Sequence, residues 1–154
     1  MNVREACAAI AAARRNLCPQ APLVSTMSAM HAFDDLGVND DMRLDAVPLM
    51  GGASGLGLGI ALMQPHATVI VVDGDASLLM ELASLVTVAN AKPKRFVHIL
   101  MHNNTQFSSI VNLPTPAAEP DCNFAQMARA AGYTQVCEIQ RLDELERALP
   151  QLLA

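Results

Sequence analysis

The run of apolar residues from Thr68 to Val72 constrains the fold of this chain more than any other segment. It shows no alternation of apolar and polar side chains, which is typical of a strand buried on both faces of a parallel sheet. A second buried strand is predicted over Phe96–Met101, and the residues between the two strands have helical character. Parallel neighbours need a crossover, which is usually a helix. The sequence therefore predicts an α/β fold, a doubly wound parallel sheet with helices on both faces.

The rest of the chain continues this alternation of strands and helices, without a repeat, a low-complexity tract or a linker. One domain spanning residues 1–154 is therefore expected. In chain order we expect a helix over Val3–Asn16, a strand over Pro22–Ser25, a helix over Ser28–Leu36, a polar loop over Gly37–Arg43, a strand or an extended segment over Leu44–Met50, a helix over Gly52–Met63, and the strand over Thr68–Val72. There follow one helix over Ser77–Ala91 capped by Asp75 or Ser77, the strand over Phe96–Met101, a long polar loop over Asn103–Pro120, a helix over Asn123–Ala131 closed by Gly132, a strand over Thr134–Ile139, and a final helix over Leu142–Leu153 interrupted near Pro150.

Composition and charge exclude several classes of protein. Hydrophobic residues make up 52% of the chain and charged residues 16%, which excludes a disordered chain. The net charge is −5 and 3% of the residues are aromatic, so neither a basic face nor a set of stacking rings for nucleic acid is expected. The longest apolar stretch, Gly51–Met63, is shorter than the about 20 residues that span a membrane. The high apolar fraction also indicates that part of the surface is buried against another chain.

The cysteines and the first residues bear on the compartment. The apolar block Ala6–Ala13 has about the length of the core of a secretory leader, but Glu5 and the lack of a small-residue cleavage site after the block favour an amphipathic first helix. The cysteines have no Cys-x-x-Cys spacing and fit buried thiols of a reducing compartment, so a cytoplasmic location is expected. These cysteines are Cys7, Cys18, Cys122 and Cys137.

Polar residues follow the two buried strands at their carboxyl ends, where ligands of doubly wound sheets bind. Asp75 stands just after the first strand and Asn103-Asn104 after the second, with 26 residues between Ala76 and Asn103. The N–H groups at the helix start after Gly74 suit a phosphate. A carboxylate beside a diphosphate is repulsive unless a cation bridges them, and Mg²⁺ does so with carboxylate, amide and phosphate oxygens. The sequence thus offers an oxygen ligand from each of two adjacent strand ends.

A glycine-rich segment leaves a second interpretation open. Gly51–Gly59 precedes a strand that ends in Asp73, and a nicotinamide dinucleotide-binding unit also places an acidic residue about 20 residues after its glycines. However, a Gly-x-Gly-x-x-Gly pattern would need glycine at position 60 or 62, where Ile60 and Leu62 stand. Alternatively, the glycines let a helix pack tightly on the sheet.

Two histidines near the second strand have a spacing that can bind zinc on a helix, His98 and His102. They fall on a predicted strand, with no further carboxylate or Cys placed beside them, so zinc is not expected. Asp73 is interpreted as structural, and Asp75 could also cap the helix that follows it.

Gly74-Asp75-Ala76, followed after 26 residues by Asn103-Asn104, resembles the Gly-Asp-Gly and Asn-Asn signature of thiamine-diphosphate enzymes. Pro48–Gly51 and the small-residue helix after it look like the segment that enters the cofactor site in this superfamily. The whole chain resembles the diphosphate-binding domain of the phosphonopyruvate and sulfopyruvate decarboxylases, which is a separate β subunit in the sulfopyruvate enzymes.

The resemblance implies the β subunit of a thiamine-diphosphate- and Mg²⁺-dependent 2-oxo acid decarboxylase that acts on 3-phosphonopyruvate or 3-sulfopyruvate. Loop Thr105–Leu113 differs from the glycine-rich loop of that family, because it has no His, no acidic residue and no glycine pair. The exact substrate therefore stays open. A carboligase or synthase with the same cofactor stays open as well.

The resemblance also implies roles for individual residues. Mg²⁺ would be held by Asp75, by the side chain of Asn104 and by the carbonyl of Gln106, while Asn103 orients the turn. Met50 would hold the cofactor bent, and the carbonyl of Pro48 would accept a hydrogen bond from its amino group. The other residues expected in the cofactor site, mostly around the diphosphate, are Thr26, Ser28, Gly74, Ala76 and Ser77.

Enzymes of this family also need a glutamate against the aminopyrimidine, which a second, pyrimidine-binding domain supplies. No glutamate of this chain has that context, so no catalytic residue is expected in it. The activating glutamate is expected from a pyrimidine-binding α subunit in a hetero-oligomer, across a surface formed by Gly51–Gly59 and Asn103–Pro116. The expected substrate is a small 2-oxo acid, and neither nucleic acid nor a membrane is expected as a partner.

Overall fold

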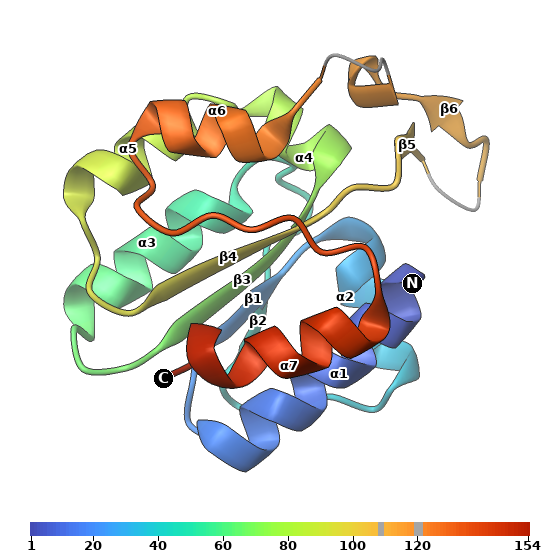
Figure 1. Cartoon of the computed structure of the whole chain (residues 1–154). Coiled ribbons are helices and arrows are strands. Elements are labelled where there is room, and N and C mark those ends of the chain that lie inside the picture. The colour runs from blue at the N-terminus through green and yellow to red at the C-terminus, as the bar shows by residue number, and fades with distance from the viewer. Residues whose placement is uncertain (108–109, 119–121) are drawn as a thin grey trace.

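The computed structural model of the chain describes residues 1–107, 110–118 and 122–154. Helices and strands alternate along it (Figure 1). The elements are α1 (Val3–Leu17), β1 (Leu23–Ser25), α2 (Met27–Asp35), β2 (Arg43–Asp45), α3 (Ala53–Met63), β3 (Val69–Gly74), α4 (Asp75–Met80), α5 (Ser84–Ala91), β4 (Phe96–Met101), β5 (Thr105–Gln106), β6 (Leu113–Pro114), a 3-10 helix (Pro116–Ala118), α6 (Phe124–Ala131) and α7 (Leu142–Leu152).

The strands β1 to β4 form one parallel sheet, in the order β2-β1-β3-β4. The order reverses between β1 and β3, so β2 lies on one side of β1 and β3 on the other. This confirms the predicted doubly wound parallel sheet. In such a sheet the reversal point is where ligands bind, at the carboxyl ends of the strands.

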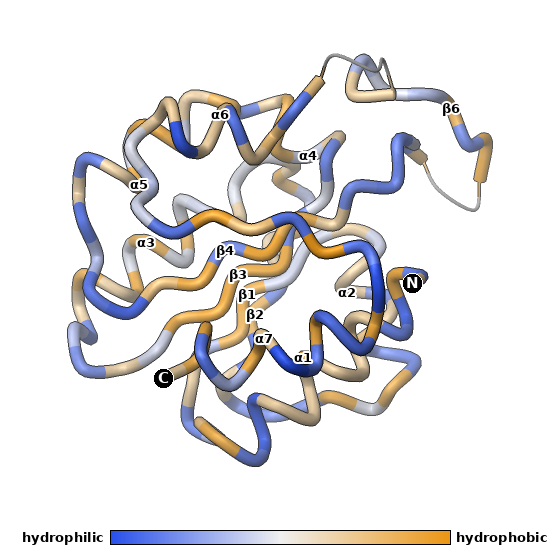
Figure 2. Tube along the Cα trace, in the orientation of Figure 1, coloured by the Kyte–Doolittle hydropathy of each residue, from blue (hydrophilic) through white to orange (hydrophobic). Residues whose placement is uncertain are grey.

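Helices cover both faces of the sheet, as predicted (Figure 1). On one face, α1, α2 and α7 pack over a core that includes Ile10, Phe33 and Leu149. On the other face lie α3, α4, α5 and α6. Successive side chains of a strand point to opposite faces, so Ile70 joins the first core and Val71 the second. Figure 2 shows β3 as apolar along most of its length.

One helical glycine is required by the packing of α3 on the sheet. A Cβ added to Gly57 would lie 2.3 Å from Val71 Cγ2 and 3.2 Å from the ring of Phe96. Only a residue without a side chain fits so close a contact. The interpretation of the glycine-rich segment as a tightly packed helix is confirmed at this position.

Two predicted elements and one predicted helix cap were wrong. The single helix over Ser77–Ala91 is broken into α4 and α5 by a turn at residues 81–83, and Gly74, not Asp75 or Ser77, stands at the N-cap of α4. The turn lets α5 change direction and contact both α3 and α6. Residues 134–139 form no strand, because this segment crosses from α6 on one face to α7 on the other (Figure 1). Its carbonyl at Val136 accepts from the Arg129 guanidinium at 3.0 Å.

The last helix is not interrupted at Pro150, which lies inside α7. Proline in a helix removes one backbone hydrogen bond and crowds the preceding turn. Here it stands in the last turn on the exposed side, while Leu145 and Leu149 hold the helix in the core. The predicted long loop after β4 is also partly regular, because β5 and β6 pair as a short antiparallel hairpin.

Candidate functional site

Asp75 and Asn104 meet at the carboxyl edge of the sheet, although 29 positions separate them in the chain. The backbone N–H of Asn104 donates to Asp75 Oδ2 at 2.7 Å, and the N–H of Ala76 donates to Asp75 Oδ1 at 2.9 Å. Asp75 is 2% exposed, so these two bonds fix the direction of its carboxylate. Each carboxylate oxygen has room for a further partner, because it carries two lone-pair positions.

The turn after β4 is built around its two asparagines. Asn103 Oδ1 accepts from the N–H of Thr105 at 3.0 Å and from its hydroxyl at 3.1 Å. The carbonyl of Asn104 accepts from the N–H of Thr115 at 3.0 Å, which ties the turn to the residue that follows β6. Asn104 itself has a positive φ of 62°, a conformation that costs energy in a residue other than glycine and that collects at functional sites.

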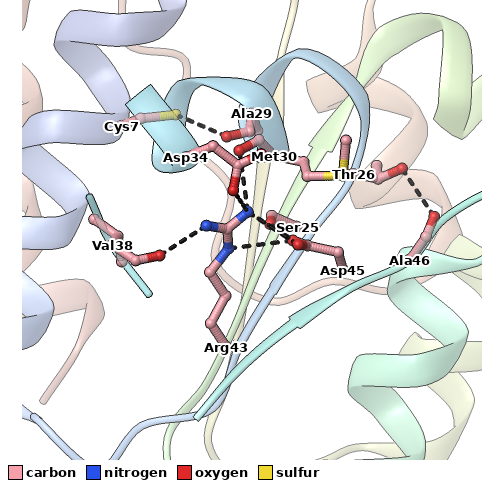
Figure 3. Close-up of polar contacts among 10 residues, drawn as sticks. All are labelled: Cys7, Ser25, Thr26, Ala29, Met30, Asp34, Val38, Arg43, Asp45 and Ala46. Atoms are coloured by element: carbon pink, nitrogen blue, oxygen red, sulfur yellow. Dashed lines mark hydrogen bonds and ion pairs between the residues drawn. The ribbon is translucent and has the colours of Figure 1, made fainter. Parts of the chain in front are cut away.

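Thr26 and Ser28 lie at the neighbouring strand end, at the start of α2. Thr26 is fully buried, and its hydroxyl donates to the carbonyl of Ala46 at 3.2 Å (Figure 3). Its N–H donates to the carbonyl of Val72 in β3 at 3.3 Å. The first N–H groups of a helix have no partner within the helix and favour an anion. The next residue, Met27, has a φ of 51°, so this turn is strained as well.

The buried side chain of Arg43 makes polar contacts to several segments near this strand end (Figure 3). Arg43 donates to the carbonyls of Val38 and Met30 at 2.7 and 3.1 Å. It also pairs with Asp34 of α2 at 2.8 Å and Asp45 of β2 at 3.0 Å, with its own side chain 5% exposed. The hydroxyl of Ser25 donates to Asp45 Oδ1 at 2.6 Å. The sequence analysis placed Arg43 in a polar loop, and only its acceptors in three separate segments reveal this role.

The Cys7 thiol lies close to the same cluster and takes no part in chemistry there (Figure 3). Its Sγ donates to the carbonyl of Ala29 at 4.0 Å. Burial raises the pKa of Cys7 to about 12, and the charge of Arg43 opposes this only weakly. Because the thiolate is the nucleophilic form, this cysteine is inert at neutral pH.

The segment that carries Pro48 and Met50 is pinned to α4. The N–H of Gly51 donates to the hydroxyl of Ser77 at 2.9 Å. Gly51 has a φ of +86°, and a Cβ added to it would lie 2.7 Å from Cβ of Glu81. Pro48 is exposed and Met50 is half-buried. The predicted cofactor residues on this segment and on α4 are therefore held at fixed positions relative to each other.

A half-open cavity of about 460 Å³ lies beside this segment, within the size range of small-molecule sites. One side of the cavity is formed by the Gly-rich segment and the start of α3, and the other side by the α4–α5 turn and α5. Its lining includes Met50 and Glu81 but not Asp75 or Asn104. The residues around it are Leu49, Met50, Gly51, Gly52, Gly55, Leu56, Leu58, Glu81, Ser84, Thr87 and Val88.

The loop expected to contact the substrate is partly described. Gln106 lies in β5, opposite Leu113 of β6, two residues after Asn104. Phe107 and Asn112 have positive φ values of 51° and 50°. Ser108 and Ser109 of the predicted loop lie outside the described residues. The hairpin leaves Phe107 53% and Leu113 46% exposed, so both side chains are accessible.

The histidines do not form a zinc site. His98 Nε2 faces Asp73 Oδ2 at 3.6 Å, whereas His102 Nε2 lies 3.2 Å from the carbonyl of Ala117 and its ring meets the ring of Phe124 edge-on. Among residues 1–107, 110–118 and 122–154, no three His, Cys, Asp or Glu side chains are arranged to hold a metal ion. In the same ranges no helix is long and apolar enough to cross a membrane.

Comparison with known proteins bears directly on this site. Residues 24–154 match the family described as thiamine pyrophosphate enzyme, C-terminal TPP binding domain. Phosphonopyruvate decarboxylase of Streptomyces hygroscopicus is 37% identical over 150 residues, which cover 90% of this chain and 33% of that protein. Sulfopyruvate decarboxylase subunit beta of Methanocaldococcus jannaschii is 34% identical over 104 residues, 68% of this chain and 53% of that subunit.

The fold is shared with a solved enzyme. Benzoylformate decarboxylase from Polynucleobacter necessarius superposes with a TM-score of 0.71 over 96% of this chain and 30% of that one, at 20% identity. At that identity the likeness concerns the fold alone. This chain spans about a third to a half of the length of the relatives it matches.

Proposed function

Because this chain belongs to the thiamine pyrophosphate enzymes, as their C-terminal TPP-binding domain, we propose that it is the diphosphate-binding β subunit of a 2-oxo acid decarboxylase. The proposed substrates are 3-phosphonopyruvate and 3-sulfopyruvate, since its relatives include decarboxylases named for both acids. We propose that residues 1–154 form one such domain and work in the cytoplasm, which the four unpaired cysteines support. The family match leaves no reason for the nicotinamide alternative.

The observation that carries the proposal is the contact of Asp75 with Asn104. A buried carboxylate is aimed by two backbone N–H groups at the edge where two strands end. A carboxylate oxygen, an amide oxygen and the nearby carbonyl of Gln106 form the oxygen set that Mg²⁺ prefers. Asp75, Asn104 and Gln106 would hold the ion, which would bridge them to the diphosphate.

The residues around this edge fit the diphosphate itself. Ala76 and Ser77 at the start of α4, after Gly74, and Thr26 and Ser28 at the start of α2 lie at one edge of the sheet, where a diphosphate would face the two helix starts. The hydroxyl and the N–H of Thr26 donate to Ala46 and Val72, and the N–H of Ala76 donates to Asp75, so these groups would shape the site rather than donate to the phosphate. When bound, thiamine diphosphate supplies the electron sink that lets a 2-oxo acid lose its carboxylate as CO2. This chain contributes the grip on the diphosphate and excludes water from that end.

Met50 and Pro48 are proposed to shape the other part of the cofactor. Both lie on the segment that the Gly51–Ser77 hydrogen bond fixes to α4, and Met50 lines the 460 Å³ cavity. A bulky apolar side chain there would support the bent cofactor. The carbonyl of Pro48 accepts from the N–H of Met50 at 3.2 Å, and its second lone pair would accept from the amino group of the cofactor.

The activating glutamate is proposed to come from a pyrimidine-binding α subunit. Relatives named as beta subunits include those of Methanocaldococcus jannaschii and Methanothermobacter thermautotrophicus, and such a name supports a partner. Large apolar side chains beside the site are exposed and support a contact surface there: Leu49, Phe107, Ile110, Val111 and Leu113.

The proposal is tested by copurifying the chain with its partner and measuring CO2 release. The assay uses phosphonopyruvate, sulfopyruvate and pyruvate, each with thiamine diphosphate and Mg²⁺. We expect turnover of one of the two anionic 3-substituted acids well above that of pyruvate. Formation of a condensation product in place of the aldehyde would instead identify a carboligase, and no turnover of any acid would reject the proposed function.

A further inference from the structure

Two buried polar residues sit next to the proposed magnesium site without a role in it, Asp73 and His98. Asp73 is fully buried, and the side chain of His98 is 5% exposed. Within the part of the chain that the structure describes, neither Asp73 Oδ2 nor His98 Nε2 has a hydrogen-bond partner. The two atoms face each other at 3.6 Å.

The pair joins the two strands that carry the proposed metal ligands. In the β3–β4 register Val71 is opposite His98, and Asp73 is opposite Leu100. Asp73 and His98 are therefore diagonal neighbours on one face of the sheet, the face on which Val71 and Phe96 pack under α3. The core cluster on this face is apolar, and a buried carboxylate needs a donor or a positive charge beside it. The imidazole of His98 is placed to provide it.

The other oxygen of Asp73 reaches the metal turn. Asp73 Oδ1 accepts from the N–H of Gly74 at 2.8 Å. The next residue is Asp75, whose carboxylate is bonded to the N–H of Asn104 at 2.7 Å. His98 of β4 thus faces Asp73, Asp73 bonds the N–H of Gly74, and the next residue of the chain, Asp75, contacts Asn104 after the end of β4.

We propose that Asp73 and His98 form a buried positioning pair that sets the geometry of the Asp75–Asn104 half-site. This inference rests on the proposed function, because it concerns the grip on magnesium and diphosphate. His98 holds the Asp73 carboxylate, and Asp73 holds the peptide of Gly74 so that Asp75 points at the edge of the sheet. Removing a group that orients metal ligands in this way typically lowers the metal affinity by about 10–100-fold.

The first experiment measures backbone hydrogen exchange in the chain without cofactor. His98→Phe keeps a ring and removes the nitrogen that faces Asp73. We expect the amides of Gly74 and Asn104 to exchange at least about tenfold faster in this variant. Val71→Ala is the matched control, because it removes apolar contacts from the same layer and leaves the pair intact. His98→Gln restores a donor and is expected to return both amides close to their wild-type rates.

The second experiment titrates Mg²⁺ into the assembled enzyme and measures thiamine diphosphate binding by calorimetry. Asp73→Ala and His98→Phe should each raise the Mg²⁺ concentration needed for half-maximal binding by about tenfold or more. The double variant should be no worse than the poorer single variant, since the two residues act as one unit.

The outcomes separate this inference from the proposed function. If the wild-type assembly binds thiamine diphosphate and the variants need the same Mg²⁺ concentration for half-maximal binding, the positioning pair is overturned and the proposed function stands. The positioning pair is also overturned if the amides of Gly74 and Asn104 exchange no faster in His98→Phe than in Val71→Ala. A wild-type assembly that binds no thiamine diphosphate overturns the proposed function, and the positioning pair falls with it.

Discussion

At the scale of single residues, the site depends on side chains that are aimed before any ligand binds. Asp75 has one backbone donor on each carboxylate oxygen, and the Ser77 hydroxyl is held by the N–H of Gly51. A buried carboxylate with fixed direction loses little freedom when it takes up a cation, which strengthens binding. Strained backbone at Met27 and Asn104 is kept by the surrounding contacts, as is common where a site needs an unusual turn.

Met50 is expected to act on catalysis more than on affinity. Met50→Ala should lower kcat by roughly tenfold to a hundredfold, because a cofactor that is not held bent presents its reacting atoms in the wrong place. The dissociation constant for thiamine diphosphate should change by less than about threefold, since the diphosphate is held elsewhere. Steady-state kinetics and calorimetry of the assembled enzyme measure the two quantities. Full activity in the variant would make Met50 an ordinary packing residue.

Glu81 tests whether the activating glutamate comes from the partner. It lines the cavity beside Met50, which its sequence context did not indicate. If the partner supplies the glutamate, Glu81→Gln should keep kcat within about threefold of wild type, because a general acid or base contributes about 10²–10⁴-fold. A loss of that larger size would place the role in this chain instead. Met80→Gln, an exposed neighbour, serves as the control.

At the scale of elements, periodicity predicted most helices and strands, and contacts between distant segments decided the rest. The strands β3 and β4 were both predicted from their own apolar residues. β3 is buried along most of its length, as predicted, whereas β4 stands at the end of the sheet order and is mostly half-buried, so its prediction as a buried strand was wrong. The break between α4 and α5 was not predicted. It lies at Glu81, which packs closely against Gly51, a residue distant in the chain. Residues 134–139 were predicted as a strand from their local pattern, but they connect α6 on one face of the sheet to α7 on the other. The local pattern does not indicate that connection.

The same limit applies to the site. The end of β3 and the asparagines after β4 were predicted to meet, since parallel strands end at one edge. The Arg43 cluster and the Asp73–His98 pair were not recognised, because each joins residues that are distant in sequence and whose types have many other uses. A single charged residue in a loop carries no signal of its eventual partners.

An ion pair between α1 and the loop before β2 gives a prediction about pH. Arg14 donates to Asp40 Oδ2 and Oδ1 at 2.7 and 2.8 Å, and this hydrogen bonding holds the pKa of Asp40 below its usual range. A lowered folded-state pKa adds stability above the unfolded value, near 3.9, and that stability is lost as the pH falls through the folded pKa. Asp40→Asn should therefore lower the free energy of unfolding by about 1 kcal/mol at pH 7, with a smaller difference near pH 3.

Urea denaturation of the chain at both pH values measures this difference. Asp41→Asn, an exposed neighbour, is the control and should change stability little at either pH. An equal effect of Asp40→Asn at pH 7 and pH 3 would contradict the account of this ion pair.

At the scale of the whole molecule, the chain presents one side of a site. The sheet edge offers a diphosphate grip, while large apolar side chains stay exposed around it, such as Leu49 at 67% and Ile110 at 81%. Exposed apolar surface of this kind marks an interaction site more often than a free surface. The chain also spans about a third to a half of the length of these relatives.

The isolated chain is therefore expected to be inactive and to self-associate. With a pyrimidine-binding partner it should form an assembly with two or four copies of each chain, because an obligate interface would cover the exposed apolar side chains. Light scattering during size-exclusion chromatography gives the mass, and CO2 release by each peak gives the activity. Strong decarboxylation by the chain alone would contradict this expectation.

The most direct test of the central claim is a calorimetric titration of thiamine diphosphate into the assembled enzyme, with and without Mg²⁺. The account predicts tight binding by the wild-type assembly with Mg²⁺ and at least about a hundredfold weaker binding after chelation. Asp75→Ala should show the same weak binding with Mg²⁺ present, while its thermal unfolding stays close to wild type. Thiamine diphosphate binding of equal affinity with and without Mg²⁺, or unchanged affinity in Asp75→Ala, would contradict the assignment of this sheet edge as the metal and diphosphate site.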